Sequence, residues 1–501
     1  MKQSIAGLAA VLLLASACTT SSYSPAPQPA APAAKATTPP PKTDWRDSVL
    51  YFVILDRFAD GDPANNRNVD VEAKGAFHGG DLAGLRAQLD DIASLGVTAL
   101  WITPTVKNID GFVTGAGFPD WAYHGYWADD FDRLDPRFGT EQQLKDLVEA
   151  AHGRGIKVLL DVVYNHAGYN THYLTDPKTK NWLRSNETGT CGNDDLTSCL
   201  SGLPDWKTEL PEVRDFLMNA QLGWAKRVGL DGFRLDTVKH VEHDFWQQHR
   251  KRSRAEVAPD FFLLGEVWGG DAQSLDPWFA GDEMDAGFDF SFQGSVLGWL
   301  QGRGRTIAFD RYLKSREKVR AGYMLSQFLS SHDVKGALAQ LDGDKDLFRL
   351  AAIVELTTVG IPMIDYGEEV ARPGGDWPEN RSDMPWGDRP IKPGAGKPRD
   401  ELLRADYKKL IAIRNAHPAL SRGVHTAVST DGDVLVFSQK DEASHDEVIV
   451  AVNRGDAPAG VTIPWSGATA NDVWNNEQLP VNAGMIKTAV APKRARIVAE
   501  R

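Results

Sequence analysis

Short apolar runs alternate with helical periods along most of this chain. After a first apolar run at 49–58, Leu85, Leu89, Ile92 and Leu95 recur at spacings of three and four, with Asp81 before them as an N-cap. Further on, the spacing of Thr140 and Gln143 predicts a capping box at the start of another helix. This alternation of strands and helices is typical of a parallel β/α architecture.

Eight apolar runs predict eight parallel strands. They lie at 49–58, 98–103, 157–163, 231–236, 261–267, 286–292, 325–330 and 361–366. Eight such strands favour a closed (β/α)8 TIM barrel, whose active site forms at the carboxyl ends of the strands. An open doubly wound sheet is the alternative, but no Gly-rich phosphate loop follows the first run.

Two segments depart from the bare barrel. More than forty residues without a helical period separate the third strand from a helix near Pro211, so we predict an inserted domain at 167–206. After a helix at 407–415, alternating runs at 433–438, 447–452 and 459–463 predict an antiparallel β domain, a sandwich, at 418–501. The barrel would then occupy 44–166 and 207–417.

The N-terminus has the pattern of an export signal. Lys2 precedes a short apolar run at 5–15 and small residues at 15–17, which predicts a signal peptide at 1–17 that is too short to span a membrane. Cys18 follows directly and resembles the acylated cysteine of a bacterial lipoprotein, although Ala15 also suits ordinary cleavage. A Pro/Ala-rich segment at 18–43 predicts a disordered tether. We expect an outer-membrane lipoprotein or a periplasmic or extracellular protein, with a lipid as the only membrane contact.

Composition and charge exclude one class of partner. The net charge of −13 and the lack of a basic stripe argue against nucleic-acid binding, and 42% hydrophobic residues suffice for a large core. Apart from Cys18 the chain holds only Cys191 and Cys199, eight residues apart in a polar loop. In an oxidising compartment we expect them to form a disulfide.

The predicted strand ends gather carboxylates. Arg234 and Asp236 are two residues apart and share one face of their strand, so the guanidinium would hold the carboxylate ionised. Glu266 and Asp333 follow two other strands. A single acid at a strand end is more often a capping or solvated residue. Three over one pocket supply the nucleophile and the acid/base of a retaining glycosidase, about 5 Å apart, with a third carboxylate to hold the sugar.

These segments resemble the five sequence regions of the α-amylase family of glycoside hydrolases, family 13. The similarity extends from about residue 49 to 423, and the order and spacing of the segments match the family. Its segments are 161–166, 203–206, 232–240, 265–268 and 328–333, with 123–127, 366–369, 380–381 and 384–386 in addition.

The resemblance implies a role for each site residue. Asp236 would be the nucleophile, Glu266 the acid/base, and Asp333 the residue that binds the 2- and 3-hydroxyls of the sugar. Arg234 would position Asp236 and keep it charged. The remaining substrate contacts would be hydroxyl donors at His124, His166 and His332, a stacking ring at Tyr126, and Lys239, His240 and Trp268 beyond the cleaved bond.

The resemblance also implies calcium, at one or two sites. Asn165, Asp205 and the carbonyl of His240 match the site that ties the inserted domain to the barrel in many family members, and oxygen ligands suit a hard cation. A second candidate resembles the N-terminal calcium loop of cyclodextrin glucanotransferases, although a plain turn is the alternative. It consists of Asp60, Asp62, Asn65, Asn66, Gly79 and Asp81.

The pair Lys239 and His240 resembles enzymes that cut α-1,4-glucans, which favours an exported, monomeric α-amylase acting on starch or maltodextrins. A cyclomaltodextrinase, a neopullulanase or a transglycosylating relative is the alternative. The residues before Trp45 predict no extra β domain, which weakens the first two. A surface glycan-binding protein without activity is less favoured, because all three carboxylates are present.

Overall fold

A computed structural model describes residues 44–115 and 117–500. The predicted signal peptide, the tether and Cys18 therefore lie outside the described residues. No helix in the described part of the chain is both long and apolar enough to cross a bilayer.

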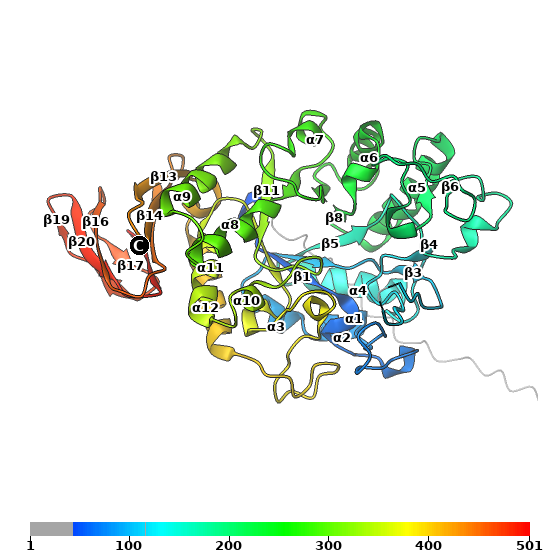
Figure 1. The fold of residues 1–501 in the computed structure, drawn as a ribbon, viewed down its shortest axis with the longest axis horizontal. Coiled ribbons are helices and arrows are strands. Elements are labelled where there is room, and N and C mark those ends of the chain that lie inside the picture. The colour runs from blue at the N-terminus through cyan, green and yellow to red at the C-terminus, as the bar shows by residue number, and fades with distance from the viewer. Residues whose placement is uncertain (1–43, 116, 501) are drawn as a thin grey trace, which may run out of the picture. The chain divides into compact units, whose positions relative to one another are not determined.

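Eight parallel strands close a barrel in the order β1-β12-β11-β10-β9-β8-β5-β2, so the TIM-barrel prediction is confirmed (Figure 1). Closure pairs β1 with β12, in the register Leu50 with Met363. The strands are almost wholly buried, as both faces of a barrel strand are covered. Their bounds are β1 Leu50–Val53, β2 Ala99–Ile102, β5 Lys157–Val162, β8 Gly232–Leu235, β9 Phe262–Gly265, β10 Ala286–Phe288, β11 Met324–Phe328 and β12 Ile361–Asp365.

Helices surround this barrel (Figure 1). The capping box of Thr140 and Gln143 begins α4, as the spacing predicts, and Pro211 is the first residue of α5. The helices are α1 Leu55–Phe58, α2 Leu82–Ala87, α3 Leu89–Ala93, α4 Glu141–His152, α5 Pro211–Val228, α6 His243–Glu256, α7 Asp276–Ala280, α8 Phe290–Leu300, α9 Thr306–Ser315, α10 Ala337–Gln340, α11 Lys345–Thr357, α12 Glu401–Ala416 and α13 Ala419–Arg422.

Three predicted elements change type or are interrupted in the structure. The run 49–58 is a strand only to Val53, and its second half is the short helix α1, all of whose residues are buried. The run 286–292 ends as a strand at Phe288, because the side chain of Asp289 caps α8. The single helix predicted after Asp81 is broken at Gln88 into α2 and α3. In the first two cases a fully buried apolar run does not distinguish strand from helix.

The segment between β5 and α5 contains only short elements. Its two strands, β6 (Leu183–Arg184) and β7 (Asp205–Trp206), pair antiparallel. The structure joins Cys191 and Cys199 in a disulfide, with their Cα atoms 5.5 Å apart. A second small sheet, β3 (Val106–Asn108) with β4 (Ala128–Leu134), follows β2.

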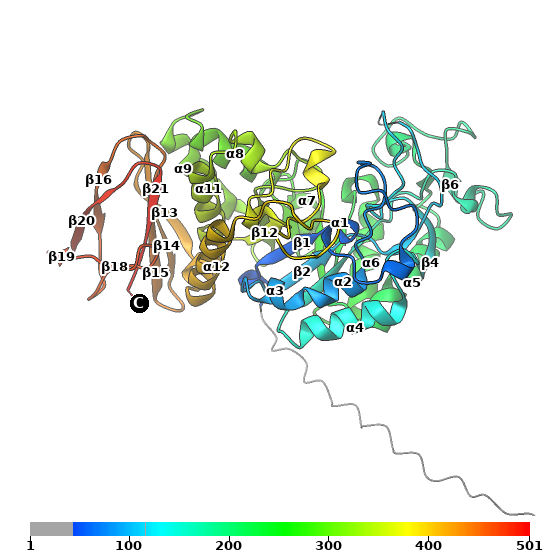
Figure 2. The same ribbon diagram turned by 90° about the horizontal axis from the view of Figure 1, so that it is seen from below.

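The chain ends in two antiparallel sheets, which confirms the predicted C-terminal β domain (Figure 2). Apolar side chains that alternate along the strands, such as Val436, Ile449 and Ile463, form a core between them. One sheet contains β13 Val424–Ser429, β14 Val434–Asp441, β15 Asp446–Asn453, β21 Arg494–Ala499, β17 Asn471–Asp472 and β18 Glu477–Gln478. The other contains β16 Ala459–Pro464, β20 Met485–Val490 and β19 Val481–Asn482.

Candidate active site

Asp236, Glu266 and Asp333 line one cleft of about 640 Å³ at the carboxyl ends of the barrel strands. Asp236 follows β8, Glu266 follows β9, and Asp333 lies beyond the end of β11. The cleft is also lined by other residues that the sequence predicted for the site, namely His124, Tyr126, His166, Lys239, His240, Trp268 and His332.

Arg234 joins three carboxylates below this cleft. Its Nη1 donates to Oδ1 of Asp236 at 2.6 Å and to both oxygens of Asp161 at 3.2 Å. Its Nη2 lies 3.1 Å from Oε1 of Glu266. These contacts follow from barrel register, because Arg234 on β8 pairs with Asp161 on β5. The guanidinium is 2% exposed, so solvent screens these interactions little.

Glu266 lies in a strongly perturbed environment. Burial raises the pKa of Glu266 to about 8, the cation of Arg234 opposes the increase, and the charges of Asp236 and Asp333 add to it. The backbone N–H of Thr237 donates to its Oε2 at 3.0 Å. The preceding Gly265 leaves no room for a larger residue, since a Cβ there would lie 2.1 Å from Sδ of Met284. Glu266 is thereby held in place and stays protonated at neutral pH.

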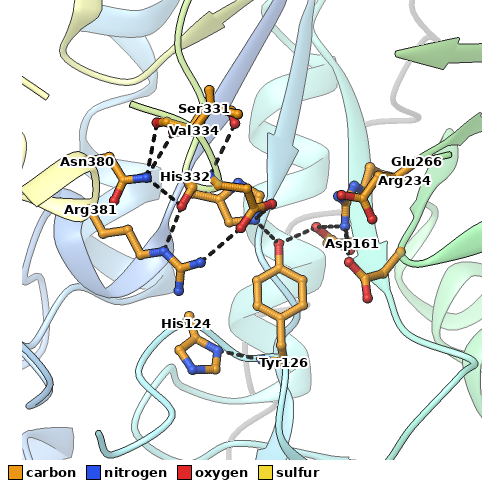
Figure 3. A network of polar contacts seen from close by, with 12 residues as sticks. His124, Tyr126, Asp161, Arg234, Glu266, Ser331, His332, Val334, Asn380 and Arg381 are labelled. Carbon is orange, nitrogen blue, oxygen red and sulfur yellow. Dashed lines mark hydrogen bonds and ion pairs between the residues drawn. The ribbon is translucent and has the colours of Figure 1, made fainter. Parts of the chain in front are cut away.

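Asp333 has the opposite environment. Burial raises its pKa, but nearby groups, His332 and Arg381 first among them, together lower it by more than burial raises it. The pKa of Asp333 therefore lies below the usual 3.8. Arg381 donates to Oδ1 of Asp333 at 3.0 Å. It also donates to the carbonyl of His332 at 2.8 Å (Figure 3). Asp333 is therefore ionised beside a protonated Glu266, so the two acids have different protonation states at pH 7.

Tyr126 connects the two sides of the site. Its hydroxyl lies 2.7 Å from Oδ2 of Asp161 and 2.9 Å from Nε2 of His332, and its ring stacks on that of His332 with centroids 5.5 Å apart (Figure 3). Burial lowers the pKa of His332 to about 3 and that of His124 well below its usual range. Both rings are neutral at pH 7, so each offers one donor and one acceptor.

His166 and His240 lie on the side of the cleft near the inserted segment. Nε2 of His166 is buried and has no hydrogen-bond partner among the described residues. Nδ1 of His240, in the short helix Val238–His240, lies 2.8 Å from the carbonyl of Asp195, inside the loop closed by the disulfide. Trp268 is 51% exposed at the rim. The disulfide loop thus contacts His240, a residue of the cleft wall.

Among the residues described, no cluster of three or more His, Cys, Asp or Glu side chains suits a metal ion. The first calcium candidate depends instead on amide and carbonyl oxygens. One end of the Asn165 amide lies 3.1 Å from the carbonyl of His240 and 3.2 Å from Oδ1 of Asp205. The amide has two possible orientations. If its nitrogen is at this end, it donates to both groups and no cation is needed. If its oxygen is at this end, three oxygens converge as they do around calcium. Arg184 already pairs with the other oxygen of Asp205, at 2.7 Å.

The second calcium candidate has unsatisfied oxygens. Oδ1 atoms of Asp60, Asn65 and Asn66 are buried and lack hydrogen-bond partners within the described ranges. The other two acids of the set have capping roles: Asp62 accepts from the N–H of Ala64, and Asp81 caps α2. A Cβ at Gly79 would lie 2.8 Å from Oδ1 of Asn66, so this backbone passes close to the unsatisfied group. The oxygens of Asp60, Asn65 and Asn66 fit a hard cation.

Two charged residues that bond directly to predicted site residues were not assigned from the sequence. Asp161 bonds to Arg234, to Tyr126 and to Nε1 of Trp101, and burial raises its pKa to about 7. Arg381 contacts Asp333 from an irregular segment 48 residues later. Asp161 was visible as an acid at a strand end, whereas Arg381 had only its place in a family-like motif as a signal.

Residues 52–188 and 182–385 match the family model of the α-amylase catalytic domain. The chain belongs to this family, the glycoside hydrolases of family 13. A periplasmic α-amylase of Escherichia coli K12 is 33% identical, over 77% of this chain and 69% of the relative. A cyclomaltodextrinase of a Bacillus species is 30% identical, over 82% and 73%. The α-amylase of Geobacillus thermoleovorans, solved with acarbose, superposes with a TM-score of 0.79 at 30% identity, over 91% of this chain and 99% of that one.

Proposed function

We propose that this glycoside hydrolase cleaves α-1,4-glucosidic bonds of maltodextrins with retention of the anomeric configuration. The observation that carries the proposal is the position of Arg234 between Asp236 and Glu266. It donates to Asp236 at 2.6 Å, while burial raises the pKa of Glu266 to about 8. Asp236 thus has a guanidinium as its direct partner, and its neighbour Glu266 is held as an acid, which supports the division of roles that a retaining glycosidase needs.

In the first step, a carboxylate oxygen of Asp236 forms a bond to the anomeric carbon as the bond from that carbon to the glycosidic oxygen breaks. Glu266 gives its proton to the departing oxygen, which leaves as a hydroxyl. In the second step, Glu266 takes a proton from water, the water oxygen bonds to the anomeric carbon, and Asp236 is released. Two inversions give net retention.

The other residues of the cleft would bind the sugar next to Asp236. Asp333, kept ionised by Arg381 at 3.0 Å, would accept from two hydroxyls, and these bonds strengthen as the ring flattens in the transition state. Neutral His124 and His332 suit uncharged hydroxyls, and the unpartnered Nε2 of His166 provides another contact. Tyr126 would supply the stacking face.

Two substrate preferences are compatible with this chemistry. Lys239 and His240 in the cleft wall support α-1,4-linked glucans in general. Similarity to a cyclomaltodextrinase at 30% identity favours a second candidate, the opening and hydrolysis of cyclodextrins, over starch as the main substrate. The two differ in which substrate the acceptor side of the cleft receives, not in the residues that carry the reaction.

The test compares initial rates on maltoheptaose, β-cyclodextrin and soluble starch, with the product anomer followed by NMR. We expect α-anomers first, and a higher kcat/KM on β-cyclodextrin than on starch if the enzyme is of the cyclomaltodextrinase type. Asp236→Asn should remove turnover while the circular dichroism spectrum is unchanged. Early β-anomers, or undiminished activity of the variant, would refute the mechanism.

We also propose that calcium stabilises the fold at one or both candidate sites. Asn165, Asp205 and the His240 carbonyl would hold one ion, and the unsatisfied oxygens of Asp60, Asn65 and Asn66 support the other. Calcium would contribute structural cross-linking there and no chemical step. Export, a lipid on Cys18 and a monomeric state are further proposals. Similarity to the periplasmic α-amylase supports export.

A further inference from the structure

An exposed tryptophan stands at the rim of the cleft, beyond the residues already assigned. Trp377 follows β12, is 38% exposed and lines the same cleft as Asp333 and Arg381. Trp268, which follows β9, lines the same cleft. Because β10 and β11 lie between β9 and β12 in the barrel, the two tryptophans come from strands that are not neighbours. Large apolar groups left exposed in a cleft mark places where a ligand supplies the missing contact.

A second ring supports Trp377 from behind. The ring of Phe118 stacks on it, with centroids 5.2 Å apart and planes 24° from parallel. Phe118 in turn lines a neighbouring cavity of about 440 Å³ together with Trp121. Gly75 makes this arrangement possible, because a Cβ there would lie 2.1 Å from the carbonyl oxygen of Pro119 and 2.8 Å from the Phe118 ring. The Phe118 ring of this pair is therefore held by close packing against the backbone at Gly75.

The tryptophan is also fixed relative to the reacting centre. Nδ2 of Asn380 donates to the carbonyls of His332 and Val334 at 2.8 and 3.1 Å, and Nε of Arg381 donates to the carbonyl of His332 (Figure 3). These residues follow Trp377 by three and four positions. The segment that carries Trp377 is therefore hydrogen-bonded, through Asn380 and Arg381, to the segment that carries Asp333. A sugar held at Trp377 then has a defined distance from the bond that is cut.

We propose that Trp377, supported by Phe118, is a distal platform that stacks a glucose unit of an α-1,4-glucan away from the cleaved bond, on the side of Asp333 and Arg381. The inference rests on the proposed function. A pyranose ring presents C–H groups along its face, which suit the negative face of an aromatic ring. The platform gives the enzyme a preference for chains long enough to reach from Asp236 to Trp377.

Chain-length dependence is the test. Trp377→Ala should raise KM for maltoheptaose roughly two- to tenfold, the range that a lost stacking contact gives, with kcat unchanged because the contact is equal in ground and transition states. On the shortest maltooligosaccharide that the wild type cleaves, kcat/KM should change by less than about twofold. Trp377→Phe should restore most of the affinity, and Phe118→Ala should show the same length dependence.

The control is Phe112→Ala. Phe112 is 49% exposed in the same segment as Phe118, but its ring packs on Trp121 and is not among the lining residues of either cavity. It should leave KM unchanged at every chain length. An equal loss on all chain lengths in Trp377→Ala, or no loss on any, would overturn the platform.

A binding series separates this inference from the proposed function. Intrinsic fluorescence titrations of Asp236→Asn and of Asp236→Asn with Trp377→Ala, using maltotriose and maltoheptaose, need no turnover. Weaker binding of maltoheptaose alone supports the platform even if the wild type cleaves no α-1,4-glucan, in which case only the proposed function fails. Identical affinities of the two proteins for maltoheptaose overturn the platform.

Discussion

Glu266 should determine the upper pH limit of the reaction if it gives its proton to the leaving oxygen. Burial raises its pKa from 4.5 to about 8, with further increases from Asp236 and Asp333 and an opposing effect of Arg234. A carboxyl with a pKa of about 8 is roughly 90% protonated at pH 7, and one with the ordinary value only about 0.3%. The burial of Glu266 therefore increases the active form roughly 300-fold at that pH.

The perturbation is a rise in pH from 6 to 9.5, applied to one enzyme with two substrates. On maltoheptaose, kcat/KM should stay level to about pH 8 and then fall about tenfold per pH unit, because the glycosidic oxygen must be protonated as it leaves. On α-maltosyl fluoride it should stay level throughout, since fluoride departs with little need of a proton. The ratio kcat/KM reports only the steps up to the first irreversible one, so the later deprotonation of water does not enter.

Glu266→Gln is the matched variant. It should lose roughly 10²- to 10⁴-fold on maltoheptaose, the usual contribution of a positioned acid, and much less on the fluoride. Two results would refute the reasoning. One is a fall in kcat/KM on maltoheptaose that already begins near pH 5. The other is the same fall in kcat/KM with rising pH on both substrates.

Three other perturbations test the surroundings of the site. Asp161→Asn removes a carboxylate that orients Arg234. We expect kcat to fall about ten- to hundredfold, as for a lost charge-assisted hydrogen bond, with an unchanged circular dichroism spectrum. An unchanged kcat would contradict the role of Asp161. Burial raises the pKa of Glu368 from 4.5 to about 8. The unfolded chain therefore releases this proton more readily than the folded one, so Glu368 destabilises the fold increasingly as pH rises from 4.5 to 8 and not below pH 4.5. Glu368→Gln should raise the free energy of unfolding by on the order of 4 kcal/mol more at pH 8 than at pH 4, measured by urea midpoints at fixed calcium, and identical pH dependences would contradict this. Calcium at 100 times its Kd should add about 2.7 kcal/mol of stability, removable by EDTA and diminished in Asp60→Ala; equal Tm values with and without calcium would argue against both sites.

The barrel and its three carboxylates were predictable because the sequence shows both the buried strands and the polar residues that follow them. Buried parallel strands are continuous apolar runs, and the polar residues that end them must gather at one rim. The run 49–58 shows the limit: Leu55 to Phe58 are as buried as the strand before them, so hydrophobicity alone could not reveal that they form α1.

The contacts that tune the site were not predictable in the same way. Asp161 is seen as a partner of Arg234 only once β5 and β8 are in register. Arg381 reaches Asp333 from a segment without periodicity, and its position depends on the hydrogen bonds of Asn380 to the His332 segment. Trp377 acquires significance only through its exposure and the ring of Phe118 behind it. Such properties depend on three-dimensional packing rather than on local pattern.

The pairing of β1 with β12 has a consequence for the order of folding. Leu50 pairs with Met363 where the barrel closes, so the first barrel strand to be synthesised waits for the last barrel strand. At about 5–20 residues per second, a ribosome needs tens of seconds to synthesise the intervening chain, and during that time the edge of β1 has no partner on this side. An unpaired apolar strand is a template for aggregation. A chaperone that covers residues 50–53 until β12 is available to pair with β1 would therefore increase the yield of active enzyme.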